Sequence, residues 1–328
     1  MKVLVTGGTG FVGSYLVRAL LSAGKEVKVL VRRRSPTQAI EGLDVEIAYG
    51  DVCDRASLDA ALKGCDTLYH AAAHMSTWER DYGPMYRTNV EGARTALRAA
   101  LRHGVERAVY TSSVVTLGAE EDGRPATEET RFNFWNLGDH YIRSKYLAEI
   151  VALEIGREGL PLVVVNPSGP IGAFDRRPSP LGGLTVRLLQ GKVQGYFEGR
   201  LPLVDVEDLA RGHLLAAEKG RIGERYILST ENLSFKAYFE MAGEVAGVEP
   251  PKVKIPASVL RVAAYASEFV AHHITRRPPA LTVSGAKVLR KAGYVDPSKA
   301  VRELGFPQSS IRASVERAVR WFKENGYA

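Results

Sequence analysis

The sequence predicts a doubly wound parallel α/β sheet, with a smaller α/β lobe in the C-terminal half. Three observations support this fold class. A glycine-rich turn follows the first apolar segment, and short apolar strands then alternate with helical segments as far as residue 165. Beyond Gly172 this alternation stops at a connection rich in proline and glycine. A chain of 328 residues is long enough for one large domain that carries a smaller lobe.

The first fifteen residues, MKVLVTGGTGFVGSY, form the segment around which the fold is organised. Residues 2–5 form a short apolar, β-branched run typical of a buried parallel strand, and a helical pattern starts at Phe11. Between them, three glycines have the spacing of a dinucleotide fingerprint with one extra residue between its first two glycines. Such glycines allow a tight turn and bring bare backbone and helix amides close to a pyrophosphate. We therefore expect a dinucleotide to contact Gly7, Gly10, Phe11, Val12 and Gly13.

The other elements of the sheet follow in order. Strands are predicted at residues 26–31, 45–49, 67–70, 107–111 and 162–165, and helices between them at residues 58–62, 82–103 and 139–158. Right-handed crossovers give 3-2-1-4-5-6 as the expected strand order, with ligands bound beyond the carboxyl ends of the strands. Residues 1–170 should form a dinucleotide-binding domain, joined by a later strand and helix at about 201–219. Residues 171–328 should mainly form a substrate-binding lobe.

The end of the second strand indicates which nicotinamide cofactor binds. An NAD-binding domain carries an acidic residue about 20 positions after the glycines, whereas an arginine there accommodates the 2′-phosphate of NADP. Three arginines occupy this position, which favours NADP(H) and leaves NAD(H) possible; a solvated basic loop is the alternative interpretation. The side chains expected to contact the cofactor beyond the glycine turn are Arg32, Arg33, Asp51, Val52, Ala71, Ala72 and Ala73.

A tyrosine and a lysine provide the candidate chemistry. Tyr141 and Lys145 are four residues apart on a predicted helix, so they share one face. A free phenol has a pKa of about 10, and a nearby ammonium together with the positive ring of an oxidised nicotinamide would lower the pKa of Tyr141. Ser113 follows the fifth strand and offers a hydroxyl to the substrate oxygen. We expect His70, at the end of the fourth strand, to be a packed histidine rather than a catalytic base.

These motifs together resemble the extended short-chain dehydrogenase/reductase family over essentially the whole chain. Within that family the sequence is most similar to the dihydroflavonol reductase-like branch, which includes bacterial proteins labelled hopanoid-associated sugar epimerases. The motifs that carry the resemblance are TGGTGFVG, Asp51, His70 to Ala73, Trp78, Asn89, Thr111 to Ser113, Tyr141 to Lys145, Asn166 to Gly172 and Leu203 to Asp208.

The resemblance implies a Rossmann fold and a role for each motif residue. Tyr141 would donate or accept the proton, Ser113 would polarise the substrate oxygen, and Lys145 would tune the tyrosine and hold the nicotinamide ribose. Asn89 would be a structural or relay residue beneath the site. Two residues after the sixth strand would also contact the cofactor, Pro167 beside the nicotinamide amide and Ser168 next to it.

One departure from the family pattern concerns the substrate. Nucleotide-sugar epimerases usually carry Arg-Asp-Tyr or Arg-Asp-Phe where this chain has Leu201-Pro202-Leu203, and their arginine grips the diphosphate. Arg200 lies one residue early, so only a shift of register would return its guanidinium to the pocket. A charge-assisted contact with a phosphate is difficult to replace with leucine. The departure therefore argues against a sugar-nucleotide substrate.

We therefore expect an NADP(H)-dependent oxidoreductase that reduces a carbonyl group to a secondary alcohol. The alternatives are a nucleotide-sugar epimerase or dehydratase with retained NAD, and a non-catalytic protein that senses the cofactor. The expected partners are a small-molecule carbonyl or alcohol and a second copy of the chain. Helices 82–103 and 139–158 would form the homodimer interface, with apolar surface from Ala96, Ala99, Ala100, Leu147, Ile150 and Val151; the alternative is that these faces simply pack on the sheet.

Composition argues against other classes of protein. The net charge of +7 comes from scattered Lys and Arg residues, with one run at residues 32–34, so no nucleic-acid partner is expected. Cys53 and Cys65 have neither metal-ligand nor disulfide spacing, which predicts no metal and fits a reducing cytoplasm. The chain begins directly with a strand, so no signal peptide is expected. Residues 255–271 are apolar but too short to span a bilayer, and no membrane partner is expected.

Overall fold

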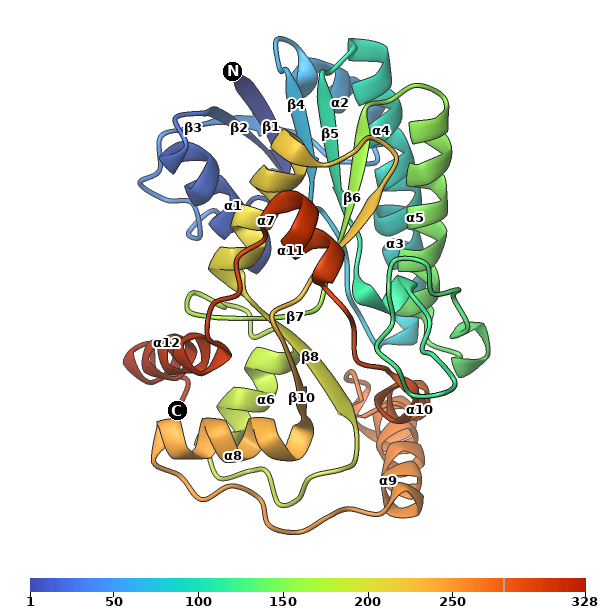
Figure 1. The fold of residues 1–328 in the computed structure, drawn as a ribbon. Helices are drawn as coiled ribbons and strands as arrows, with labels where there is room; N and C mark the ends of the chain where they lie inside the picture. The colour runs from blue at the N-terminus through green and yellow to red at the C-terminus, as the bar shows by residue number, and fades with distance from the viewer. Residues whose placement is uncertain (280) are drawn as a thin grey trace.

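The large sheet has seven parallel strands in the order β3-β2-β1-β4-β5-β6-β9 in this computed structural model, which describes residues 1–279 and 281–328 (Figure 1). The fold class and the predicted order of the first six strands are confirmed. The seventh strand, β9, was missed because its apolar run is only three residues long. The strands are β1 (Lys2–Thr6), β2 (Glu26–Val31), β3 (Val45–Tyr49), β4 (Thr67–His70), β5 (Arg107–Thr111), β6 (Leu162–Pro167) and β9 (Arg225–Leu228).

Helices cover both faces of this sheet, as in a Rossmann fold. Alternate residues of β1 point to opposite faces: Leu4 packs with one set of helices, and Val3 and Val5 pack with the other. The first set is α2 (Arg55–Leu62), α4 (Gly92–His103) and α5 (His140–Arg157). The second set is α1 (Phe11–Ser22), α7 (Val206–Lys219) and α11 (Ser298–Leu304).

The helix predicted at residues 82–103 is not uniform. It begins as α3 (Tyr82–Tyr86), passes through a π-type turn η2 (Arg87–Glu91) and continues as α4, and a short 3₁₀ turn η1 (Glu79–Asp81) precedes it. A π turn adds one residue to the helical repeat, and such turns are often found at functional sites. Asn89 lies inside this turn and is buried.

The C-terminal lobe contains a second, three-stranded sheet with the order β10-β8-β7. The strand predicted near residue 201 forms as β8 but belongs to this sheet, which corrects its assignment to the large one. The chain leaves the large sheet directly after β6, and β7 then pairs with β8. The elements are β7 (Gly169–Ile171), β8 (Arg200–Asp205), β10 (Glu231–Ser234), α6 (Pro180–Leu189), α8 (Phe235–Ala246), α9 (Ala257–Val270), η5 (Ala271–Thr275), α10 (Val283–Lys291) and α12 (Ile311–Glu324).

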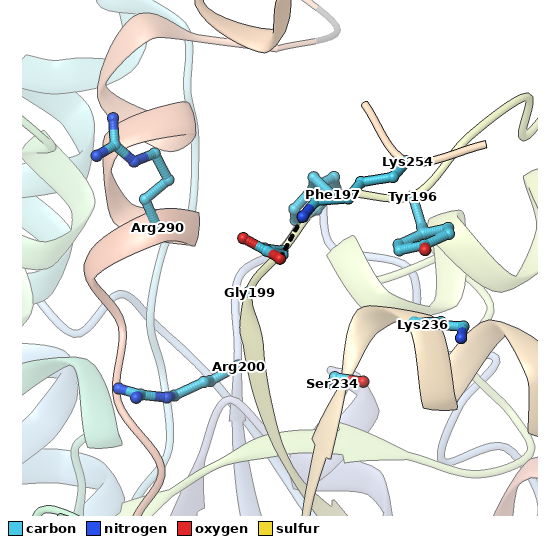
Figure 2. Close-up of a pocket in the computed structure, with 9 residues that line it drawn as sticks. Tyr196, Phe197, Gly199, Arg200, Ser234, Lys236, Lys254 and Arg290 are labelled. Carbon is cyan, nitrogen blue, oxygen red and sulfur yellow. Dashed lines mark hydrogen bonds and ion pairs between the residues drawn. The ribbon is translucent and has the colours of Figure 1, made fainter. Parts of the chain in front are cut away.

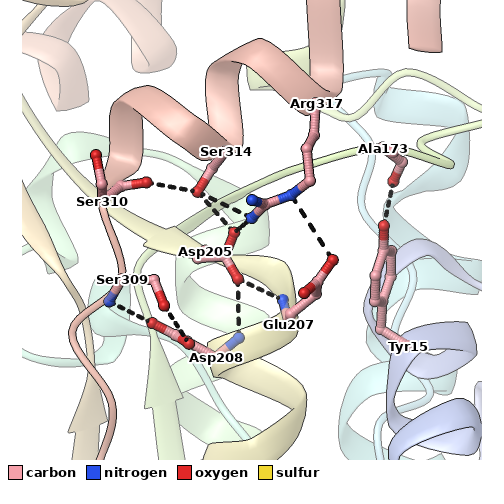
Figure 3. Close-up of polar contacts among 9 residues, drawn as sticks. All are labelled: Tyr15, Ala173, Asp205, Glu207, Asp208, Ser309, Ser310, Ser314 and Arg317. Carbon is pink, nitrogen blue, oxygen red and sulfur yellow. Dashed lines mark hydrogen bonds and ion pairs between the residues drawn. The ribbon is translucent and has the colours of Figure 1, made fainter. Parts of the chain in front are cut away.

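Two aspartates clamp α12 to the start of α7 (Figure 3). Asp205 caps α7 by accepting hydrogen bonds from two backbone amides of its first turn, each at 2.9 Å. The same carboxylate accepts a hydrogen bond from Ser314 at 2.6 Å and pairs with Arg317, both on α12. Asp208 accepts hydrogen bonds from the amide and hydroxyl of Ser309 at 2.7 and 2.9 Å. This part of the Leu203 to Asp208 motif therefore joins the two lobes.

The surface expected to form the homodimer is largely internal. Ala96, Ala99 and Ala100 have no exposed surface, and they pack with Val151 in the core beneath α4 and α5. The assignment of these four side chains to an intermolecular surface is therefore wrong, because α4 and α5 use them against the sheet and each other. The homodimer itself stays a prediction.

Candidate active site

A cavity of about 820 Å³ lies at the carboxyl ends of β1, β2, β3 and β4. The glycine turn, the loop after β2 and the segment after β4 supply most of its lining. Nine of the predicted cofactor residues line it: Gly7, Gly10, Phe11, Arg32, Asp51, Val52, Ala71, Ala72 and Ala73. The others, which lie outside this lining, are Val12, Gly13, Arg33, Lys145, Pro167 and Ser168.

The glycine turn leaves no room for a side chain at Gly7 or Gly13. Gly7 has a φ of 76°, and a Cβ atom there would lie 2.7 Å from the backbone of Ala71. A Cβ atom on Gly13 would lie 2.1 Å from the carbonyl oxygen of Gly7. Gly10 begins α1 without a side-chain cap, so the first amides of the helix face outward without a side-chain partner. The bare turn and the uncapped helix fit the pyrophosphate of a dinucleotide.

The cavity also receives arginines that the sequence argument missed. Arg176 and Arg177, in the loop after β7, line it together with Arg32 from the loop after β2. Arg33 instead lies over the ring of Tyr49, with its guanidinium carbon 5.3 Å from the ring centroid. The loop after β7 has no helical or strand periodicity, so only its two adjacent arginines could have marked it. Arginine side chains from both lobes therefore line the cavity.

Lys145, one of the three candidate catalytic residues, is buried. Its ammonium group donates a hydrogen bond to the carbonyl oxygen of Thr111 at 2.9 Å and lies 5.3 Å from the ring centroid of Tyr110. Burial lowers the pKa of Lys145 to about 8, and the negative charge of Glu149 opposes this decrease. The lysine therefore remains mostly protonated at neutral pH.

Tyr141 occupies the first turn of α5, which Asp139 caps by accepting a hydrogen bond from the amide of Ile142 at 3.0 Å. Burial, assisted by the charge of Asp139, raises the pKa of Tyr141 to about 12. The decrease that the sequence argument expected from Lys145 and a bound oxidised nicotinamide is not found in the protein alone, where desolvation by burial dominates the pKa of Tyr141. Tyr141 is a neutral phenol at physiological pH.

Ser113 starts the 3₁₀ turn η3 (Val114–Thr116), and its hydroxyl accepts a hydrogen bond from the amide of Val115 at 3.4 Å. This turn contacts α5, and Val115 packs in the same apolar cluster as Tyr141. Thr111, whose carbonyl holds Lys145, is two residues away from Ser113. The structure thus brings the three predicted catalytic residues to one edge of the sheet.

Asn89 connects the first turn of α5 to the segment after β4. Its side-chain amide donates hydrogen bonds to the carbonyl of His74 and the hydroxyl of Ser144, both at 2.9 Å, and its oxygen accepts one from the amide of His74 at 2.7 Å. Ser144 in turn donates to the carbonyl oxygen of Tyr141 at 2.8 Å. The π turn directs Asn89 inward, and the residue acts as a structural link beneath the site.

Sequence reasoning missed a buried carboxylate behind the Ser113 turn. Glu149 is 2% exposed and accepts hydrogen bonds from Thr116 and Asn166 at 2.7 Å and from Arg225 at 3.0 Å. Asn166 also donates to the carbonyl of Ser113 at 3.2 Å. The sequence did offer one signal for this carboxylate, because Glu149 lies four residues after Lys145 and so shares its helix face. Its ion-pair partner could not be identified from the sequence, because Arg225 is 76 residues away. This network fixes the turn that carries Ser113.

His70 is packed, as predicted. A hydrogen bond of 2.9 Å joins its Nδ1 atom to the hydroxyl of Thr6, and its ring lies parallel to that of Tyr110. Burial lowers the pKa of His70 to about 3, with the charge of Lys145 adding to the effect. Pro167 ends β6, and the buried Ser168 follows it. Within residues 1–279 and 281–328, no cluster of three or more His, Cys, Asp or Glu could hold a metal ion.

Comparisons with known proteins agree with this geometry. The sequence model of the NAD dependent epimerase/dehydratase family matches residues 3–229. A Synechocystis protein named for dihydroflavonol 4-reductase is 41% identical over 327 residues, which cover 98% of this chain and 95% of the relative. The crystal structure of gox2253 superposes with a TM-score of 0.89 at 40% identity and 99% coverage of both chains. A nucleoside-diphosphate-sugar epimerase from Pseudomonas aeruginosa has a TM-score of 0.84 at 26% identity, covering 100% of this chain and 99% of its own.

Proposed function

This chain belongs to the NAD-dependent epimerase/dehydratase family, and we propose that within it the protein is an NADP(H)-dependent reductase of carbonyl compounds. One observation carries the proposal. Lys145 is hydrogen-bonded to the end of the strand that leads to Ser113, Tyr141 packs in the same cluster as Val115 of the Ser113 turn, and the cavity with the bare glycine turn lies at the same edge of the sheet. The name of the 41% identical relative, dihydroflavonol 4-reductase, supports reduction to a secondary alcohol.

The protonation states of the side chains suit reduction. When bound, NADPH supplies the hydride for the carbonyl carbon. Tyr141 is protonated at neutral pH, with a pKa of about 12, so its phenol is ready to donate a proton to the substrate oxygen. Ser113 donates a hydrogen bond to the same oxygen and stabilises the negative charge that develops there. Lys145 is mostly an ammonium ion, and its charge stabilises the phenolate that remains after proton transfer.

The first test concerns the cofactor. Arg32 is exposed at the cavity lining, so NADPH should bind more tightly than NADH. One charge-assisted contact corresponds to a preference of about ten- to a hundred-fold. Titration of the intrinsic fluorescence with each cofactor measures both dissociation constants. Arg32→Ala should reduce the preference, whereas Arg34→Ala, in the same loop but outside the lining, should not. Equal dissociation constants in the wild-type protein would contradict an NADP(H) enzyme.

A second candidate function rests on another cavity, of about 480 Å³, in the C-terminal lobe (Figure 2). Arg200, Lys236, Lys254 and Arg290 contribute to its lining, and Glu198 pairs with Lys254. Arg200 lines this cavity, and its guanidinium lies over the ring of Tyr294, 5.3 Å from the ring centroid. Cations are therefore available for an anionic substrate, which favours a nucleotide-sugar epimerase. The epimerase from P. aeruginosa, at 26% identity, is consistent with this alternative.

Calorimetry distinguishes the two functions. The NADP-loaded protein is titrated with UDP-glucose and with UDP-galactose. The reductase proposal expects no binding in the micromolar range, because Leu201 places an apolar side chain where the epimerases carry their arginine. Micromolar binding that Arg200→Ala abolishes would favour the epimerase. Arg221→Ala, a surface change beside Glu303, is the matched control.

A further inference from the structure

The helix α9 exposes its apolar side chains to solvent. Only Leu260 and Ala264 of its fourteen residues are buried, where they pack against Ala286 of α10. Its remaining side chains are mostly apolar, and six large ones are exposed along α9 and the following turn η5. These define the outer face: Val259, Val262, Tyr265, Phe269, Val270 and Ile274, of which Val262, Phe269 and Ile274 are 60–68% exposed.

The outer face is continuous rather than scattered. With 3.6 residues per turn, its members on α9 spread over roughly half of the helix circumference, opposite Leu260 and Ala264. A helix that is apolar on all sides is normally buried, and large contiguous apolar patches on a protein surface mark interaction sites. Packing on α10 already holds α9 in place, so the outer face is available for a partner.

Positive charge is concentrated in the segment of the chain that carries this face, where two of the lysines, Lys252 and Lys254, pair with Glu249 and Glu198. Residues 251–291 contain eight Lys and Arg residues against a single acid, Glu268. The net charge of this segment is therefore +7. The whole chain, with 44 basic and 37 acidic residues, has the same net charge of +7, so the residues outside the segment have no net charge. The carboxylate of Glu268 accepts a hydrogen bond from the amide of Val283 at 2.8 Å and is engaged on the inner side. The basic residues are therefore less scattered than the sequence argument held, and the partner of the outer face should be anionic.

We propose that the outer face of α9 and η5 docks on the surface of an anionic lipid bilayer. An apolar stripe with aromatic side chains and a cationic rim is the arrangement by which helices lie in the membrane interface. No helix within residues 1–279 and 281–328 is long and apolar enough to cross a membrane, so docking would be peripheral. A second copy is the less favoured occupant, because a two-fold contact would bring two strongly positive faces together.

Docking would place the bilayer next to the candidate active site. In η5, the ring of His272 lies 5.2 Å from that of Trp78, and its Nε2 atom lies 3.2 Å from a carboxylate oxygen of Glu79. On α10, Val288 packs in the apolar cluster that contains Tyr141. The helix α10 thus packs both against α9, which carries the outer face, and in the cluster that contains Tyr141. This proposal replaces the expectation of no membrane partner, because the sequence showed an apolar segment but not which of its faces is exposed.

Vesicle co-sedimentation tests the proposal with the full-length protein. The vesicles contain phosphatidylcholine alone or an equimolar mixture of phosphatidylcholine and phosphatidylglycerol. We expect binding to the anionic vesicles that weakens with added salt, and little binding to phosphatidylcholine alone. Val262→Glu and Phe269→Glu should each weaken binding about ten-fold or more. Arg276→Ala and Arg277→Ala should each weaken it about five-fold. Circular dichroism and cofactor binding confirm that each variant is folded.

The matched control is Ile222→Glu, which introduces the same charge at a side chain that is 59% exposed but lies outside the outer face. Its vesicle binding should equal that of the wild type. Three results would overturn the proposal: no binding to anionic vesicles, equal binding to both kinds of vesicle, or an equal loss in Ile222→Glu. Light scattering that shows a dimer which Phe269→Glu dissociates would assign the face to a second copy instead.

Discussion

Replacement of Tyr141 by phenylalanine should reduce turnover by about 10²- to 10⁴-fold, which is the usual contribution of a general acid. The substitution removes only the hydroxyl, and the ring keeps its place in the cluster with Val115 and Val288. The fold and the affinity for NADPH should therefore survive. Steady-state oxidation of NADPH with a reducible ketone measures the loss, and fluorescence titration measures cofactor binding.

The matched control is Tyr146→Phe. Tyr146 lies on the same helix, but its ring stacks on that of Phe132 with the centroids 3.8 Å apart. Removal of its hydroxyl should change turnover by less than two-fold, on the order of a surface substitution. Near-normal activity of Tyr141→Phe would show that another group delivers the proton, and the assigned chemistry would be wrong.

Glu149→Ala should lower the free energy of unfolding by about 3 kcal/mol, the lower end of the range for a buried ion pair, because the Arg225 side chain that loses its partner is 25% exposed. The substitution removes the acceptor shared by Arg225, Thr116 and Asn166. Urea denaturation followed by circular dichroism measures the change. Since Asn166 also holds the carbonyl of Ser113, the activity of the remaining folded protein should fall as well.

Glu158→Ala provides the comparison for this variant. Glu158 follows the same helix and pairs with Arg98, but both side chains are exposed by more than a third. Exposed ion pairs contribute about 0–1 kcal/mol, so this variant should unfold almost like the wild type. Equal losses in the two variants would show that the buried network has no special role in stability.

The sequence was sufficient for the parts of the fold that depend on local patterns. The glycine turn, the first six strands and their order follow from short apolar runs, turn residues and the handedness of crossovers. The second sheet could not be predicted, because β7, β8 and β10 are three to six residues long and their paired residues lie 28 to 34 positions apart in sequence. For the same reason β8 was assigned to the wrong sheet.

The part of the site that was predicted consists of motif residues that directly follow a strand of the large sheet. Gly7, Arg32 and Asp51 line the cavity as expected. Arg176 was missed because it enters the cavity from the other lobe, through a loop without periodicity. The raised pKa of Tyr141 in the protein without cofactor was not foreseen, since its burial depends on side chains from η3 and α10 that no local pattern connects to α5. The decrease expected with a bound oxidised nicotinamide stays a prediction.

The most direct test of the reductase assignment follows the hydride. The protein is incubated with NADPH that carries deuterium at both positions of nicotinamide C4, together with a panel of ketones and aldehydes. Mass spectrometry of the products then locates the label. We predict a secondary alcohol with one deuterium on the carbinol carbon for at least one ketone, and no product from Tyr141→Phe on the same time scale. Interconversion of UDP-glucose and UDP-galactose, without any labelled alcohol or net oxidation of NADPH, would contradict the account.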